Sequence, residues 1–174
     1  MSWPLVALGD ITSKIGSGAT PRGGQKAYKT EGIPLIRSMN VHDGKFTPKG
    51  LAFIDEGQAS ALQNVTLFKG DVLLNITGAS VARSCRLPHE YSGGRVNQHV
   101  AIIRPMHERL LPEYLEHLLV SPTTKRVLLG IASGGATREA ITKTAIEELK
   151  ILLPPLEEQK RIAGILDQAD LVPI

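Results

Sequence analysis

The sequence is poor in cysteine and in long apolar runs, and each shortage excludes a class of protein. Its one cysteine, Cys85, rules out a disulfide framework within the chain and a cysteine-rich zinc site. The longest apolar stretches, such as Val72–Ile76 and Val100–Ile103, have the length of a strand, not of a membrane span. The N-terminus lacks the basic start and long apolar segment of a secretory signal. These absences favour a cytoplasmic globular protein without a membrane segment.

The residue patterns of nucleotide-binding and catalytic sites are also missing. The glycine-rich stretch that starts at Gly16 fails as a phosphate-binding loop, because Gly24 and Gln25 stand where Lys and Ser or Thr are needed. The Pro-Pro of Leu153–Leu156 lacks the polar residue and the aromatic residue with which a methyltransferase receives a flipped base. No carboxylates cluster as in a nuclease, and the five histidines lack metal-ligand spacing. We therefore expect no catalytic residue, no metal and no cofactor.

What the sequence does contain is a basic excess in its first part. The net charge is +3. Residues 1–100 hold 11 Lys and Arg against 7 Asp and Glu, whereas residues 101–174 hold 9 against 10. This distribution suits a domain that offers one basic face to a polyanion. Charge alone does not identify the ligand, because many metabolic enzymes show a similar balance.

Apolar patterning divides the chain into a strand-rich first part and a helical second part. Up to about residue 104, short apolar runs are broken by Gly, Pro, Asn and Asp, as is typical of strands and turns. The predicted strands are Leu5–Leu8, Ile33–Arg37, Leu51–Ile54, Val65–Phe68, Val72–Thr77, Ser84–Leu87 and Val96–Ile103. Long polar connections over Gly16–Thr30 and Met39–Gly50 separate them, and loops of this length are usually functional or mobile.

Helical signals begin near residue 110. Pro112 suits a first helical turn, Ser121 suits the cap of a second helix, and Thr144 with Glu147 forms the pattern of a capping box. The predicted helices are Glu113–Val120, a second from Pro122 to about Gly130, Ala145–Leu149, and a last one from Leu156 to about Leu171. An extended segment, Lys150–Leu153, precedes the last helix.

The last helix carries one apolar stripe, which makes it the candidate interaction surface. Its members are Ile162, Ile165, Leu166 and Ala169. The stripe either packs on its own domain or meets another helix. We favour the helix–helix interface, because the spacing fits a coiled-coil seam. A homodimer through this helix would read an interrupted palindrome.

Several stretches occur in the order found in the specificity subunits of type I restriction–modification systems, and the chain resembles that family. They are Trp3–Ile11, Gly18–Pro21, Gly32–Ile36, Lys69–Ser80, Val96–Arg104, Gly134–Arg138 and Leu153–Leu166. Each is weak alone, but together they cover nearly the whole chain. The resemblance implies a mixed α/β fold, with a strand-rich target-recognition domain and C-terminal helices over residues 1–153. Residues 154–174 would be the start of the conserved spacer and dimerisation helix, which forms a coiled coil in the family.

The resemblance also implies a function. In the family, a full subunit carries two recognition domains, and each reads one half of a split target in double-stranded DNA. The conserved helices measure the spacer and dock the methylation subunits, and the translocase–nuclease subunits join that core. The chain would be a non-catalytic part of a complex that methylates adenine and cleaves unmodified sites. It holds one recognition domain and stops early in the first conserved helix, as a half subunit or a truncated piece would.

Polar loops beside the predicted strands hold the candidate DNA contacts. Arg reads guanine and Asn or Gln reads adenine, whereas Ser, Thr, Lys and backbone N–H groups hold phosphates. The candidates are Thr20, Arg22, Lys26, Tyr28, Arg37, Asn40, Arg83, Arg86, Gln98 and Arg138. Each has a structural alternative, either a solvated surface position or a side chain that closes a turn. We favour the structural role for Asn97, whose short amide suits turn hydrogen bonds.

Two other functions remain open at this stage. The chain could be a protein-interaction half subunit that docks on, or competes within, a modification complex and hardly binds DNA itself. It could also be a catalytic fragment of a fused restriction–methylation enzyme, which the missing motifs disfavour. A steep salt dependence of DNA affinity would separate DNA reading from docking. Methyl transfer by the chain alone would support the catalytic fragment.

Overall fold

A four-stranded antiparallel sheet of order β2-β10-β7-β8 lies at the centre of the computed structural model, which describes residues 2–134 and 140–170. Three smaller sheets flank it, with orders β6-β3-β9, β4-β5 and β1-β11. The strands are Leu5–Ala7 (β1), Thr12–Ser17 (β2), Ile33–Ile36 (β3), Val41–His42 (β4), Lys45–Phe46 (β5), Ala52–Ile54 (β6), Val72–Asn75 (β7), Ser84–Arg86 (β8), Arg95–Val96 (β9), Val100–Pro105 (β10) and Lys150–Leu152 (β11).

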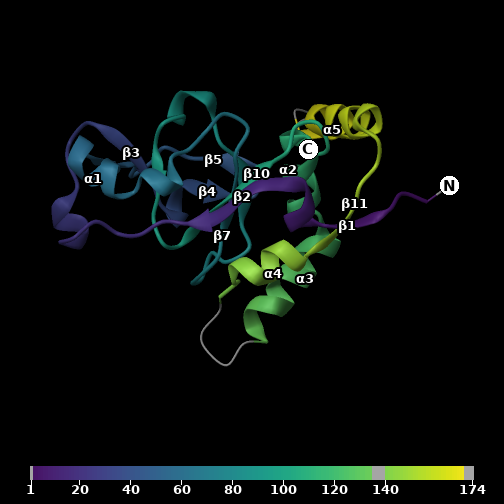
Figure 1. The fold of residues 1–174 in the computed structure, drawn as a ribbon, viewed down its shortest axis with the longest axis horizontal. Coiled ribbons are helices and arrows are strands. Elements are labelled where there is room, and N and C mark those ends of the chain that lie inside the picture. The colour runs from purple at the N-terminus through teal and green to yellow at the C-terminus, as the bar shows by residue number, and fades with distance from the viewer. Residues whose placement is uncertain (1, 135–139, 171–174) are drawn as a thin grey trace.

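The helices belong mainly to the second half of the chain. They are Glu56–Ala61 (α1), Pro112–Val120 (α2), Pro122–Ser133 (α3), Lys143–Glu148 (α4) and Leu156–Asp170 (α5). Figure 1 shows β3 and α1 at one end of the molecule, the central sheet in the middle, and β1, β11 and α5 toward the other end. No helix within residues 2–134 and 140–170 is long and apolar enough to cross a bilayer.

Both faces of the central sheet are buried. Side chains alternate between the faces of a strand, so β10 sends Ala101 and Ile103 into one core and Ile102 into another. β7 behaves in the same way, with Leu74 in the first core and Leu73 in the second. The first core packs against the C-terminal helices, and the second packs against β3 and β6. This double burial explains why β7 and β10 read as unbroken apolar runs.

The predicted mixed α/β class is confirmed, but two of the predicted strands are wrong. Val65–Phe68 is not a strand, because Gln63–Val65 forms a 3₁₀ turn and the chain then runs irregularly. The run Val96–Ile103 divides into β9 and β10, because a turn at Asn97 interrupts it. The side-chain Oδ1 of Asn97 accepts a hydrogen bond from the backbone N–H of His99 at 3.0 Å, which is the structural role favoured for this amide.

Helix α4 begins at Lys143, two residues before the predicted start at Ala145. Its cap is Thr142, whose hydroxyl accepts a hydrogen bond from Ala145 N at 3.1 Å, so the capping box assigned to Thr144 was wrong. Helix α1 was missed, although Asp55 and Gln58 form a reciprocal capping box at its start with both bonds at 2.8 Å. Asp55 and Glu56 are therefore the cap and the first residue of a helix.

Strand β2 was also missed, because Ser, Lys and Gly dominate Thr12–Ser17 and resemble a loop. Its pairing with the buried strand β10 holds it extended, with Ile15 opposite Ile103 and Ser17 opposite Ala101. Tertiary pairing thus overrides a weak local preference. The long polar connection predicted from Gly16 therefore starts with the end of a strand.

Candidate DNA interface

One edge of the central sheet gathers the strand ends that carry most of the candidate DNA contacts. Strands β2 and β7 end there, and β10 and β8 begin there, because neighbouring strands are antiparallel. Strand β3 reaches the same edge, since the backbone N–H of Asn97 donates to the carbonyl of Ile36 at 3.1 Å. We call this surface the recognition edge and define it as residues 17–28, 37–40, 76–83 and 97–99. These segments contain no Asp or Glu.

The glycine-rich loop after β2 is tied to the start of β10. The backbone N–H of Gly18 donates to the carbonyl of Asn97 at 3.0 Å. A Cβ at Gly18 would lie 1.8 Å from the carbonyl oxygen of Val96, so only glycine allows this approach. Two residues later, the hydroxyl of Thr20 donates to the side-chain oxygen of Gln98. Thr20 and Gln98 were both predicted contacts, and the fold brings them together on the exposed surface.

The same loop ends against the residue that follows β3. The guanidinium of Arg37 lies 5.1 Å from the centroid of the Tyr28 ring, within cation–π range. Arg37 also donates to the carbonyl of Gly50 at 2.5 Å. Between Thr20 and Tyr28, the side chains of Arg22 and Lys26 are exposed and have no ion pair in the described part of the chain. The loop therefore presents two free cations between two anchored ends.

The turn between β7 and β8 presents Arg83 at this edge. Ala82 before it has a φ of 74°, a left-handed conformation that costs an alanine on the order of 1 kcal/mol. The turn is held from below by Asn75, whose Nδ2 donates to Ser80 Oγ at 3.1 Å and to Ser38 O at 3.0 Å. Ala82 is buried and Arg83 is exposed. The strained residue therefore directs the arginine out of the core.

Asn40 does not fit the DNA-contact prediction. Its side chain is fully buried, and its amide donates to Thr47 O at 2.9 Å and to Lys49 O at 3.2 Å. Its side-chain oxygen accepts from the backbone N–H of Arg37 at 3.0 Å. These bonds tie the turn after β3 to the segment that follows β5. Asn40 therefore shapes the recognition edge from within and is not available to bases.

Arg86 also does not fit the DNA-contact prediction. It ends β8 at the edge of the sheet opposite the recognition edge, and its guanidinium is engaged inside the protein. Nε donates to Glu116 Oε1 at 2.9 Å, and Nη2 donates to Asp167 Oδ1 at 3.2 Å. A guanidinium held by two carboxylates is not free to bind a phosphate or guanine. The sequence could not separate Arg86 from Arg83, because both flank the same short strand.

Arg138 lies outside the described residues, but the segment that follows it meets the recognition edge. Ala140 forms a bridge with Thr77, and Ile141 N donates to Ile76 O at 2.8 Å. Thr77 itself was not predicted as a contact. Its hydroxyl hydrogen-bonds Nδ1 of His99 at this edge. Thr77 and His99 each lie within two residues of the end of a buried strand. This position is the sequence signal that could have identified them as members of the recognition edge.

Comparison with known protein families identifies the family of the chain. The family model described as "Type I restriction modification DNA specificity domain" matches residues 2–172. The chain belongs to this family. Among curated relatives of the specificity domain, the putative type I restriction enzyme MjaX specificity subunit of Methanocaldococcus jannaschii is 28% identical over 97% of this chain and 39% of the relative. The EcoKI specificity subunit of Escherichia coli strain K12 is 27% identical over 95% of this chain and 35% of the relative.

Solved specificity-subunit structures share the fold. The HsdS subunit from Thermoanaerobacter tengcongensis superposes with a TM-score of 0.69 at 27% identity, over 98% of this chain and 37% of the other. The type I S subunit from M. genitalium, at 14% identity and a TM-score of 0.64, supports the fold alone. The chain spans little more than a third of the length of these relatives.

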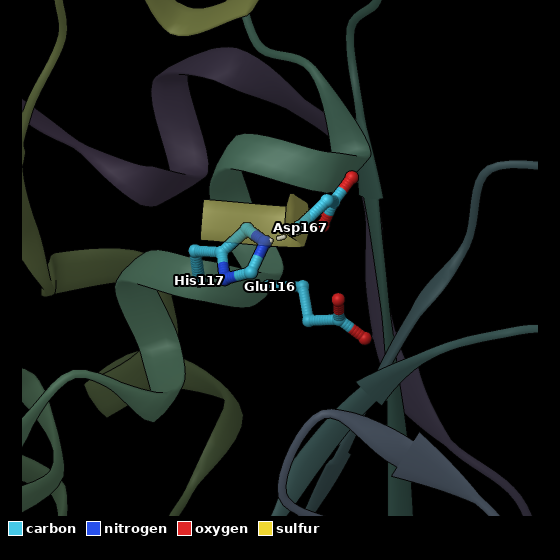
Figure 2. Close-up of side chains that lie close together, drawn as sticks. All are labelled: Glu116, His117 and Asp167. Atoms are coloured by element: carbon cyan, nitrogen blue, oxygen red, sulfur yellow. Dashed lines mark hydrogen bonds and ion pairs between the residues drawn. The ribbon is translucent and has the colours of Figure 1, made fainter. Parts of the chain in front are cut away.

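Helix α5 carries the predicted apolar stripe, which is only partly buried. Ile162 packs against the first core, contrary to a purely external stripe. Ile165 and Leu166 are 53% and 39% exposed, and Ala169 is also exposed. Another face of α5 makes polar contacts that join the helix to α2 and β8. Figure 2 shows Glu116 and His117 of α2 beside Asp167 of α5.

Proposed function

We propose that this chain binds double-stranded DNA through the recognition edge and reads one half of a bipartite target for a type I restriction–modification complex. One observation carries the proposal: the edge combines the cations Arg22, Lys26, Arg37 and Arg83 with hydroxyl and amide groups, and it contains no acidic residue. A polyanion is attracted to such a surface, and side-chain amides and guanidinium groups discriminate base edges.

The residues of the edge suit different parts of the duplex. Arg83, exposed at the end of the turn that leads into β8, has the forked donors for a guanine. Gln98, positioned by its bond to Thr20, offers the donor and acceptor pair that matches adenine. Arg22 and Lys26 lie on a glycine-rich loop and suit phosphates, which carry no sequence information. Arg138 remains a candidate for the same surface.

The division of labour along the chain is part of the proposal. Residues 1–153 form the recognition domain, and residues 154–174 begin the spacer helix after Pro154 and Pro155. The methylation subunits would dock on this helix, and the translocase–nuclease subunits would join through the complex. The catalytic residues of methylation and cleavage would belong to those partners. A homodimer would form through the exposed side chains of Ile165, Leu166 and Ala169.

Selection from a randomised duplex library tests the function. The chain is reconstituted with a cognate methylation subunit, and the enriched DNA is sequenced. We expect one short motif, whose enrichment Arg83→Ala reduces at least about fivefold at one base position, since a bidentate contact supplies about 1–3 kcal/mol. Arg109→Ala is the matched control, because Arg109 is exposed beyond the opposite end of β10. Assembly without any enriched motif would refute sequence reading.

The exposed apolar residues of α5 favour a second candidate, a docking half subunit with little DNA binding. Ile165 and Leu166 are the relevant observation, because they are adjacent and exposed, and contiguous exposed apolar surface marks interaction sites. The two candidates differ in salt dependence. A DNA reader loses affinity steeply between 50 and 200 mM salt, at a slope near 0.9 per phosphate contact. A docking subunit shows no comparable dependence for DNA.

A further inference from the structure

Helix α5 is seated on the domain by a polar anchor near its start. Gln159 is fully buried, and its side-chain oxygen accepts from the backbone N–H of Leu111 at 2.9 Å. Its amide donates to Arg109 O and to Pro154 O, both at 2.9 Å. Ala163, one turn later on the same face, is buried and small enough to let the helix approach α2 closely.

A second anchor lies one further turn along the same face. Asp167 Oδ1 is 2.6 Å from Nε2 of His117 on α2 and 3.2 Å from Nη2 of Arg86 on β8 (Figure 2). Glu116, next to His117, is 6% exposed in its side chain and holds Arg86 from the other side. It also accepts a bond from the backbone N–H of Arg86 at 2.7 Å. Three elements thus meet at one carboxylate.

This cluster has the spacing of a metal site but not its chemistry. One ligand atom each from Glu116, His117 and Asp167 lies within 4.8 Å of the others. The guanidinium of Arg86 already bonds both carboxylates. A metal ion would have to displace it and would then face its charge at close range. The cluster is therefore better described as an ion-pair junction between the helix and the sheet.

We propose that Arg86, His117 and Asp167 form a clamp of positioning residues that sets the direction of α5 relative to the recognition edge. Through that direction, the clamp sets the distance between the two half-targets that the assembled subunit accepts. This second statement rests on the proposed function. The clamp and the edge are joined by one short strand, since Arg83 precedes β8 at the recognition edge and Arg86 ends it at the clamp.

The geometry makes the spacing sensitive to the clamp. Helix α5 has 15 residues, which corresponds to a length of about 22 Å. A rotation of roughly 10° about its anchored start would move its far end by about 4 Å, which is close to the rise of one base pair. The buried Gln159 and Ala163 hold the first half of the helix. Asp167, two turns beyond Gln159, holds the second half, so losing its bonds would remove the polar contacts that oppose a rotation of the far end.

The clamp also determines where the apolar stripe points. Residues 159, 163 and 167 recur every four positions and share one face of α5, whereas Leu166 lies beside that face and Ile165 nearly opposite it. Any helix that pairs with the stripe therefore inherits its orientation from the clamp. A loose clamp would let the same pairing occur at several angles between the two recognition domains.

Pulsed electron paramagnetic resonance tests the clamp without DNA. Spin labels are attached to cysteines introduced at Ala79 on the recognition edge and at Gln168 on α5, both exposed; buried Cys85 stays unlabelled. We expect one narrow distance distribution in the parent chain and at least a twofold broader one in Asp167→Ala. Asp170→Ala is the control, because Asp170 is exposed on the same helix and has no ion pair in the described residues. An unchanged width in Asp167→Ala would overturn the clamp.

A spacer library tests the consequence for DNA. Two copies of the chain are assembled with the methylation subunits, and duplexes carrying the enriched motif twice, at graded separations, are competed. The parent should select one separation, and Asp167→Ala should accept three or more while its affinity for a single motif stays within twofold. Selection of the same single separation by Asp167→Ala would overturn the role in spacing. Absence of any motif in the parent would instead refute the proposed function and leave the label distances to judge the clamp.

Discussion

Two arginines only three residues apart flank the ends of β8, and their surroundings in the fold are opposite. Arg83, before the strand, is exposed and has no ion pair in the described residues, because Asp43 beside it pairs with Lys125. Arg86, at its end, is held by Glu116 and Asp167. The difference shows that a cation becomes available to a ligand only where the fold leaves it without an internal carboxylate. Arg104 resembles Arg86 in this respect. It lies at the end of the sheet away from the recognition edge, and its guanidinium pairs with Asp71.

The largest expected effect is on stability, and it separates the two arginines. Arg86→Met should lower the free energy of unfolding by about 2–3 kcal/mol, because Glu116 would remain buried without its partner. The value lies below that of a fully buried pair, since water reaches about a third of the Arg86 side chain. Arg83→Met should change it by less than about 0.5 kcal/mol. Urea denaturation of the two variants measures both, and equal midpoints would contradict the comparison.

A second contrast concerns two amides of the recognition edge. Asn40→Ala should cost about 2 kcal/mol of stability, because it removes a fully buried amide and its three hydrogen bonds to the backbone, and should leave the enriched DNA motif the same. Gln98→Ala should do the reverse, with stability within about 0.5 kcal/mol and one altered base preference. Thermal unfolding and library selection on both variants provide the check. If only Asn40→Ala changed the motif, Gln98 would not be the amide that reads a base.

The third prediction concerns the loop cations. Replacing both Arg22 and Lys26 by Ala should reduce the slope of log affinity against log salt by about 2, because two phosphate contacts are lost. The selected motif should stay the same, since phosphate contacts carry no sequence information. The matched control replaces Lys160 and Arg161 on α5, which are also exposed. Fluorescence anisotropy at several salt concentrations gives the slopes, and equal slopes in both double variants would remove the loop from the interface.

The smallest effect concerns Cys85, midway along β8. Burial, and secondarily the negative charge of Glu116, raises the pKa of this thiol from 9.0 to about 12. A raised pKa means that the folded chain favours the neutral thiol, so this contribution to stability is complete below pH 9 and declines as pH rises toward 12. In native protein at about pH 8, a thiol reagent should therefore not react with Cys85, whereas it should react in urea. Reaction of native protein would show that the strand between the two arginines opens.

Much of the candidate interface could be predicted from the sequence, because strand ends and glycine-rich loops are local features. Thr20, Arg22 and Lys26 were identified from such a loop, and all three lie exposed at the recognition edge. Asn40 was misjudged for a physical reason. A short amide after a strand can either face solvent or bond nearby backbone groups, and only the path of the following hairpin decides between these. Whether these exposed residues contact DNA remains a prediction.

The sequence alone determined the class of fold, the boundary between strands and helices, and the family, because apolar periodicity and ordered motifs are properties of neighbouring residues. The tertiary structure decided which charges are free. Arg83 and Arg86 have the same chemistry and nearly the same position in the chain, and they differ in what approaches them from far away in the sequence. Glu116 and Asp167 lie 30 and 81 residues from Arg86. A pairing over such distances depends on how α2 and α5 pack, which no local pattern encodes.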